Sequence, residues 1–237
     1  MTSHADDRLI RDWHANGESS LCLLLQHSNT DQNDDYIPVI CQRLAQLARD
    51  QVPDLTDVIP GRDSITIISR EPANLTTIRD SIDSLVDLAA SQAQESSGTL
   101  HDIPVCYDDR LGNDIDELSR VVNLSRDEII HRHLSKTYRL DMLGFLPGFL
   151  YLSGLDESLM IPRKSTPAIS VAAGSVAIAE NMSGIYSLSS PGGWWVIGRT
   201  PARIFKLDQN PPVTLQPLDH IRFYQIDYQE WLREADD

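Results

Sequence analysis

The chain has 237 residues, 41% of them hydrophobic, and carries 35 acidic against 20 basic side chains, for a formal charge of −15. This is the composition of an acidic globular protein of one large or two small domains, and it excludes nucleic acid and membrane surfaces as expected partners, because both require a cationic surface. The start of the chain has no export-signal pattern, and the longest apolar stretch, Leu140 to Leu152, is too short to cross a bilayer, so we expect a cytoplasmic protein.

The first part of the chain alternates strand-like and helix-like patterns. The apolar run Ser20–Gln26 predicts a buried strand. Apolar residues then recur at spacings of three and four, which predicts a helix from about Asp34 to Asp50. Two further strand-like runs, Asp57–Pro60 and Ser64–Ser69, are separated by a three-residue loop that begins with glycine, so we expect a hairpin there.

A second amphipathic pattern follows the hairpin. It runs from Leu75 to Ala89, with Asn74 as the expected N-cap, and a last strand is expected at Leu100–Tyr107. The order of elements is therefore β-α-β-β-α-β, which predicts a ferredoxin-like α+β domain over residues 1–107. That fold hosts many functions and identifies none of them.

The remaining sequence changes character. Residues 108–136 are expected to form a helical linker, in which Ile115 to Val122 shows an amphipathic pattern and Ser125 with Glu128 forms a capping box that opens a second helix. From residue 137 onward, short apolar runs interrupted by Gly and Pro predict an all-β barrel over residues 137–237. The expected strands include Ile169–Ala179, Gly184–Leu188, Trp194–Ile197, Ala202–Leu207 and Ile221–Ile226.

Two loops concentrate residues that could carry chemistry. Leu143 to Tyr151 alternates rings with Gly and Pro, and Ser190 to Pro201 combines glycines with Arg199. Rings, backbone amides and a guanidinium suit a pocket for a small carboxylate-bearing ligand, whereas the alternative is that both loops are barrel corners whose rings fill the core. No Walker A loop or dinucleotide fingerprint is present, and His131 and His133 would point about 200° apart on a helix, so we expect no metal site.

These motifs, taken together, resemble those of a known family. The stretch from about residue 104 to 226 is similar to the family of 5-oxoprolinase B subunits, which includes allophanate hydrolase subunit 1-like proteins and the sporulation kinase inhibitor KipI. The segments that carry the resemblance are His133-x4-Tyr138, Met142 to Leu152, Gly154-Leu-Asp156, Pro162-Arg163, Ala173 to Ile178, Gly184-Ile-Tyr186, Ser190 to Trp194, Ile197 to Pro201 and Pro211-Pro212.

The resemblance implies a fold, a set of partners and an activity. It implies a cyclophilin-like β-barrel as the second domain and a partner with a related barrel, the KipA-like C subunit, the pair being similar to the carboxyltransferase domain of urea carboxylase. With a third protein, the A subunit, such pairs form an ATP-dependent 5-oxoprolinase that opens the lactam of 5-oxoproline to glutamate. Two alternatives remain open: a non-catalytic inhibitor that binds a sensor histidine kinase, as KipI does, and a carboxyltransferase-like or allophanate hydrolase subunit that acts on another small amide.

The same resemblance carries over a set of site residues. For these positions our own hypotheses, from residue chemistry, are His133 for proton transfer, Arg163 and Arg199 for holding a carboxylate or phosphate, and the Gly192 and Gly193 amides for supporting oxyanion charge. The implied catalytic residues are His133 and Arg199, and the implied substrate-binding residues are Tyr138, Phe145, Pro147, Phe149, Tyr151, Pro162, Arg163, Tyr186, Ser190, Gly192, Gly193 and Trp194.

This sequence departs from the family pattern in two loops of the expected pocket. Ala168 stands where the family usually has arginine. Glu180 and Met182 stand where it usually has glycine and glutamine. The departures favour an altered substrate or a regulatory paralogue.

Overall fold

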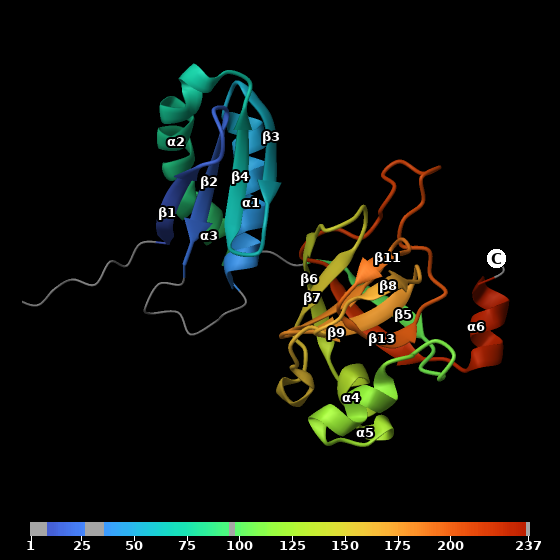
Figure 1. The fold of residues 1–237 in the computed structure, drawn as a ribbon. Helices are drawn as coiled ribbons and strands as arrows, with labels where there is room; N and C mark the ends of the chain where they lie inside the picture. Colours follow the sequence, from blue (N-terminus) through green and yellow to red (C-terminus); the bar gives the residue numbers. More distant parts are fainter. Residues whose placement is uncertain (1–8, 27–35, 95–97, 236–237) are drawn as a thin grey trace, which may run out of the picture. The chain divides into compact units, whose positions relative to one another are not determined.

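The computed structural model describes residues 9–26, 36–94 and 98–235. The chain forms two compact units, residues 1–97 and residues 98–237 (Figure 1). Both units mix helices with sheets, so the protein has the α+β class expected from its sequence. Within the described residues, every helix falls short of the length and apolar character needed to cross a membrane.

The first unit contains a four-stranded antiparallel sheet of strand order β1-β2-β4-β3, and its helix α1 packs against α3. The apolar positions of α1 that recur every three or four residues are buried, as the pattern predicts. The elements are β1 (Ile10–Ala15), β2 (Ser20–Leu25), α1 (Tyr36–Gln51), β3 (Leu55–Pro60), β4 (Ser64–Ser69), the 3-10 turn η1 (Pro72–Asn74), α2 (Leu75–Asp83) and α3 (Val86–Gln94).

Several predicted elements of this unit are confirmed. The strand expected at Ser20–Gln26 is β2, and the two runs after it form the hairpin β3–β4. The first helix is confirmed as α1, although the start expected at Asp34 lies outside the described residues. Strand β1 was not predicted, because its sequence is mostly polar. It lies at the edge of the sheet, where its only neighbouring strand is β2, and most of its side chains are exposed.

The second helix differs from the prediction in two ways. It is divided into α2 and α3 at Ser84 and Leu85, and the Asn74 side chain makes no capping hydrogen bond. Asn74 already has helical backbone angles because the turn η1 precedes it, and its amide instead donates to Asp54 Oδ2 at 3.4 Å. An N-cap requires extended backbone, which explains why the predicted cap is absent.

The predicted ferredoxin-like arrangement is not confirmed, because the strand that would complete it lies in the other unit. Strand β5 (Leu100–Val105) pairs in parallel with β13 (His220–Gln225), in a register that places Leu100 beside His220. Its side chains Ile103 and Val105 are buried in the core of the second unit. The pairing with β13 and the burial of these two apolar side chains both stabilise the strand in the second unit.

The second unit is built on a curled, half-barrel sheet of seven strands, in the order β12-β9-β10-β7-β6-β13-β5, with a separate two-stranded sheet β11-β8 (Figure 1). Helices α4 and α5 contact each other, with α4 also against β12 and α5 also against β13. The further elements are α4 (Ile115–Val122), α5 (Arg126–Leu134), β6 (Thr137–Leu143), β7 (Leu150–Ser153), η2 (Glu157–Leu159), β8 (Ala168–Val171), β9 (Ser175–Ala179), β10 (Met182–Ile185), β11 (Ser190–Gly192), β12 (Trp195–Arg199) and α6 (Tyr228–Ala235).

The local predictions for this unit have mixed outcomes. The capping box is confirmed, since Ser125 Oγ accepts from the Glu128 amide at 3.3 Å and Glu128 Oε2 accepts from the Ser125 amide at 2.8 Å. The single run expected at Ile169–Ala179 is two strands, because Gly174 turns the chain with a φ of 81°. The strand expected at Ala202–Leu207 is wrong: this segment is a loop, and it forms part of a cavity wall.

Candidate functional site

A cavity of about 500 Å³ lies beside Arg199 in the second unit. Its volume is within the range of small-molecule sites, which is roughly 300–1,000 Å³. Two of the expected site residues, Tyr186 and Arg199, contribute to it. Its wall comes from the Gly174 turn, the segment after β10, the end of β12 with the loop that follows it, and helix α6. The lining residues are Ala173, Gly174, Tyr186, Ser187, Leu188, Arg199, Thr200, Pro201, Ala202, Arg203, Ile204, Phe205, Trp231, Leu232 and Ala235.

Arg199 is held in place without being neutralised. Its Nε–H donates to the carbonyl of Ala173 at 2.7 Å, and its guanidinium carbon lies 5.3 Å from the ring centre of Trp231. In the part of the chain that the structure describes, no carboxylate pairs with Arg199. Burial lowers the pKa of Arg199, yet a guanidinium stays charged at neutral pH. The side chain therefore offers a positioned cation to an anion in the cavity.

Five of the expected binding residues meet in one aromatic cluster, formed by Phe145, Phe149, Tyr151, Tyr186 and Trp194. Phe149 is its centre: its ring centroid lies 4.7 Å from that of Tyr151, 5.0 Å from Tyr186 and 5.4 Å from Trp194. All three pairs meet edge to face, the geometry that aromatic rings prefer. The cluster adjoins the cavity through Tyr186, which is the one member of the cluster that contributes to the cavity wall.

The glycines next to this cluster are required by close packing. A Cβ on Gly192 would overlap the Tyr186 hydroxyl, so no larger residue fits there without movement. The Gly193 carbonyl accepts from the Lys164 amide at 2.8 Å, which ties this loop to the Pro162-Arg163 loop. The oxyanion role of the two glycine amides stays a prediction.

Arg163 is exposed at the edge of the aromatic cluster. Burial raises the pKa of Tyr151 and of Tyr186, and the positive charge of Arg163 acts against that rise at both hydroxyls. Among the described residues, no carboxylate is paired with Arg163. A second cation thus lies near the cluster, although the cavity beside Arg199 does not include it.

His133 lies in the core and is not among the residues that line the cavity beside Arg199. Its Nδ1 is 2.8 Å from the Tyr107 hydroxyl, its Nε2 is 3.0 Å from Ser183 Oγ, and its ring stacks on Phe223 at 4.8 Å. Burial lowers the pKa of His133 from 6.5 to about 3, so the imidazole is neutral at physiological pH. With both nitrogens hydrogen-bonded and no exposed surface, this geometry favours a structural role over proton transfer.

The buried neutral state of His133 predicts a pH dependence of stability. The pKa of His133 is lower in the folded than in the unfolded chain. The contribution of the neutral imidazole to the free energy of unfolding is therefore complete above pH 6.5 and is lost as the pH falls from 6.5 toward 3. Between about pH 7.5 and pH 5.5, the wild-type protein should lose about 1 kcal/mol more unfolding free energy than His133→Asn, which cannot titrate. Urea unfolding at the two pH values measures this difference, and equal losses in the two proteins would contradict it.

The other expected residues mainly hold loops together. Tyr138 is buried and donates its hydroxyl to the His133 carbonyl at 2.9 Å. The Pro147 carbonyl accepts a hydrogen bond from Ser187 Oγ at 2.5 Å. The Pro162 carbonyl accepts one from the Trp195 indole N–H at 2.9 Å. Ser190 Oγ donates to the neighbouring Pro191 carbonyl at 3.1 Å. These contacts are with the protein itself, so they give the loops their shape.

The three departures from the family pattern have distinct surroundings. Met182 is buried in the aromatic cluster's hydrophobic core, and Ala168 packs against the same core. Glu180 has a φ of 54°, in the left-handed region that favours glycine, and its side chain is exposed. Met182 and Ala168 make the packing around the rings apolar, whereas Glu180 adds a surface charge.

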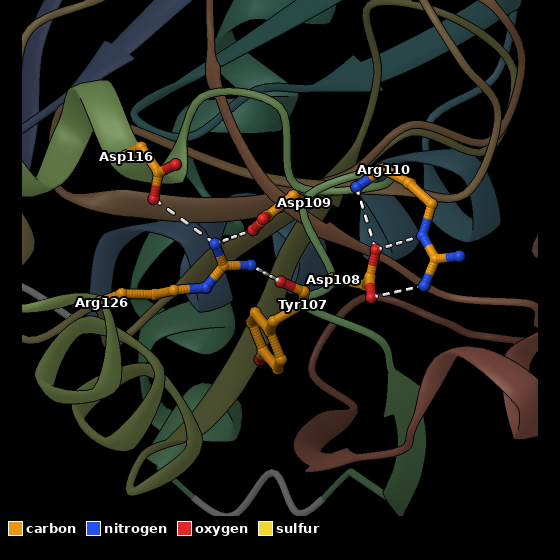
Figure 2. A network of polar contacts seen from close by, with 6 residues as sticks. All are labelled: Tyr107, Asp108, Asp109, Arg110, Asp116 and Arg126. Atoms are coloured by element: carbon orange, nitrogen blue, oxygen red, sulfur yellow. Dashed lines mark hydrogen bonds and ion pairs between the residues drawn. The ribbon is translucent and has the colours of Figure 1, made fainter.

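The residues around α6 were not among those expected from the sequence to form the site. Tyr228 and Trp231 stack at 6.0 Å, and the Arg110 guanidinium lies 3.3 Å from the Tyr228 ring centre. Figure 2 shows how the loop after β5 presents Arg110: its guanidinium binds both carboxylate oxygens of Asp108, at 2.6 and 2.7 Å. Tyr228, Trp231 and Leu232 are spaced by three and four, which was the signal for a helix with an apolar face.

The same loop is tied to α5. Figure 2 shows the Arg126 guanidinium directed at the carboxylates of Asp109 and Asp116 and at the carbonyl of Tyr107. One side chain from the start of α5 thereby bridges the loop and the first turn of α4.

Residues 9–26, 36–94 and 98–235 contain no group of three or more His, Cys, Asp or Glu side chains placed to hold a metal ion.

The fold and site define a class: an α+β protein of two units, whose curled sheet carries an aromatic cluster and, next to it, a cavity with an arginine that pairs with no carboxylate among the described residues. Residues 12–215 match the family model for the carboxyltransferase domain, subdomain C and D. The chain is 32% identical over 216 residues to the 5-oxoprolinase B subunit of Bacillus subtilis (strain 168), covering 86% of this chain and 90% of that protein. It is 35% identical over 208 residues to the 5-oxoprolinase B subunit of Escherichia coli O157:H7, covering 87% and 92%. The chain belongs to the family of 5-oxoprolinase B subunits.

Solved structures share this fold. The chain is 29% identical to TTHA0988, with a TM-score of 0.70 over 88% of this chain, and it spans 40% of the length of that one. It is 32% identical to the conserved uncharacterized protein PH0987 from Pyrococcus horikoshii, with a TM-score of 0.55, covering 93% of this chain and 100% of that one. Urea carboxylase from Kluyveromyces lactis, 19% identical with a TM-score of 0.71 over 95% of this chain and 22% of that one, shares the fold alone.

Proposed function

We propose that this chain is the B subunit of an ATP-dependent 5-oxoprolinase, inactive alone, which acts with the A and C subunits to hydrolyse 5-oxoproline to glutamate. The observation that carries the proposal is the unpaired guanidinium of Arg199 at a cavity of about 500 Å³. The family membership supports it, since the relatives that cover most of the chain bear that name.

The substrate has the chemistry that this cavity accommodates. 5-Oxoproline is a compact five-membered lactam with one carboxylate, and Arg199 can bind a carboxylate through planar, charge-assisted hydrogen bonds. Tyr186, whose ring packs edge to face on Phe149, contributes to the cavity wall beside the place proposed for the lactam ring. Arg199 thus orients the lactam, while the aromatic cluster limits the size of what enters.

ATP is the remaining reactant in the proposed reaction. A lactam is a stable amide, and phosphorylation of its carbonyl oxygen would make its carbon a better electrophile for water. We assign this chain no ATP site and propose that its own part is to bind and orient the lactam. Arg163, exposed and unpaired among the described residues, is a further candidate for an anionic group of the substrate or of a phosphorylated intermediate.

The proposal includes a fold and an assembly. We propose that the curled sheet of the second unit is a cyclophilin-like barrel and that it pairs with the related barrel of the KipA-like C subunit, in the cytoplasm. The three loops that face the aromatic cluster, at Phe145, Arg163 and Gly192, would then complete their site against that partner.

An omission experiment tests the function. The chain is mixed with its cognate A and C subunits, and ATP-dependent release of glutamate from 5-oxoproline is measured against mixtures that lack one protein in turn. Turnover is expected only in the complete mixture. Turnover that persists without this chain, or a stable complete assembly without any turnover, would reject the proposed role.

A further inference from the structure

The helix α6 lies beyond the residues that match the family model, which end at residue 215, yet it closes one side of the cavity beside Arg199. Trp231, Leu232 and Ala235 from this helix all contribute to the cavity wall. No residue of α6 is fully buried, so the helix is seated by a few specific side chains and not by a deep apolar face.

A continuous stack of charged and aromatic groups seats the helix. It begins at Asp108, which binds Arg110 through both carboxylate oxygens. The Arg110 guanidinium lies on the Tyr228 ring at 3.3 Å, and Tyr228 lies nearly parallel to Trp231, at an interplanar angle of 13°. The stack ends where Arg199 lies over Trp231 at 5.3 Å. Trp231 is thereby held against the cation that we assign to the substrate carboxylate.

Trp231 also has a hydrogen-bonding group that the protein leaves unused. Its indole Nε1–H is buried and has no acceptor among the described residues. A buried donor without a partner costs free energy, and tryptophan is normally placed so that this group is satisfied. Trp231, which lies against Arg199 and contributes to the cavity wall, therefore also carries a buried, unsatisfied donor.

We propose that Trp231 is a positioning and specificity residue of this site: its ring orients Arg199, and its indole N–H becomes satisfied by an oxygen of the bound carboxylate. The inference rests on the proposed function, since it takes the cavity beside Arg199 as the site of a small ring-bearing carboxylate. A carboxylate suits the pair because it presents two acceptor oxygens to two donors. Because Nε1 is buried in the free chain, this contact requires α6 to move when the ligand binds.

Two substitutions separate the two roles. Trp231→Phe keeps a ring on Arg199 and removes the N–H, whereas Trp231→Ala removes both. In the complete mixture of subunits, Trp231→Phe should raise the KM for 5-oxoproline about fivefold to tenfold with little change in kcat, and Trp231→Ala should raise it further. Calorimetric titration of 5-oxoproline into the full chain measures the matching loss in affinity. Gln229→Ala, an exposed change on the same helix, is the control and should behave as wild type.

Thermal unfolding of the free chain gives a readout that a merely structural role would not produce. Because the N–H has no partner in the described part of the free protein, Trp231→Phe should leave the Tm unchanged or raise it while it weakens binding. A lowered Tm together with unchanged KM and affinity would overturn the inference.

The outcomes also separate this inference from the proposed function. If Arg199→Ala impairs binding and Trp231→Phe does not, the role of Trp231 is wrong and the function stands. If the wild-type chain shows neither turnover in the mixture nor binding of 5-oxoproline, both are wrong.

Discussion

Replacing Arg199 with alanine is expected to lower kcat/KM for 5-oxoproline about 100-fold in the complete mixture of subunits, because the cavity loses the cation that orients the substrate carboxylate. The effect should be large because Arg199 has no carboxylate partner among the described residues, so its charge is available to a ligand. Steady-state kinetics at saturating ATP measure the loss, and gel filtration establishes that the variant still assembles.

Two further variants show whether the planar guanidinium matters. Arg199→Lys keeps the charge but loses the fork of donors that matches a carboxylate, so it should recover only part of the activity. Arg222→Ala is the matched control: Arg222 forms an exposed pair with Asp102 on the edge of the sheet, and its loss should leave kcat/KM unchanged. Full activity in Arg199→Ala would remove this residue from the substrate site.

Phe149→Ala is expected to destabilise the second unit by about 3–5 kcal/mol, the cost typical of deleting a fully buried ring. Phe149 is 1% exposed and contacts four other rings, so its removal opens a cavity at the centre of the aromatic cluster. Urea unfolding followed by tryptophan fluorescence measures the change. Three of the four tryptophans, Trp194, Trp195 and Trp231, are in this unit and report on it.

Phe145 provides the matched control for this prediction. It lies four residues away in the same loop, but its side chain is 63% exposed and its backbone has a φ of 63°. Phe145→Ala should therefore cost less than about 1 kcal/mol. Similar unfolding midpoints for the Phe145 and Phe149 variants would show that the cluster is not packed around Phe149 as described.

The two phenylalanines illustrate what a pattern can and cannot reveal. The repeated spacing of aromatic residues with Gly and Pro predicted that the rings of this loop either line a pocket or fill the core, and three of them form one cluster with Tyr186 and Trp194. The pattern did not distinguish the buried ring from the exposed one, because Phe149 is covered by Tyr186 and Trp194, which are distant in sequence. The two interpretations left open, a pocket wall and core filling, both describe part of this cluster.

His133 and Arg199 show the same limit at the site. Both stand in motifs that resemble those of the family, yet one is enclosed by Tyr107, Phe223 and Ser183, and the other lies at a cavity. An imidazole of ordinary pKa near neutrality suggested proton transfer, but burial depresses that pKa. No local pattern contains the desolvation that causes this shift.

The sequence by itself determined the family, the α+β class and most helices and strands, because apolar spacing, capping residues and turn glycines act over a few neighbouring residues. Only the tertiary structure decided that β5 joins β13, that His133 is buried and that Trp231 stacks on Arg199. Each of these features depends on which segments, distant in sequence, bury their apolar surface against one another. That choice depends on the packing of the whole core and not on any local pattern.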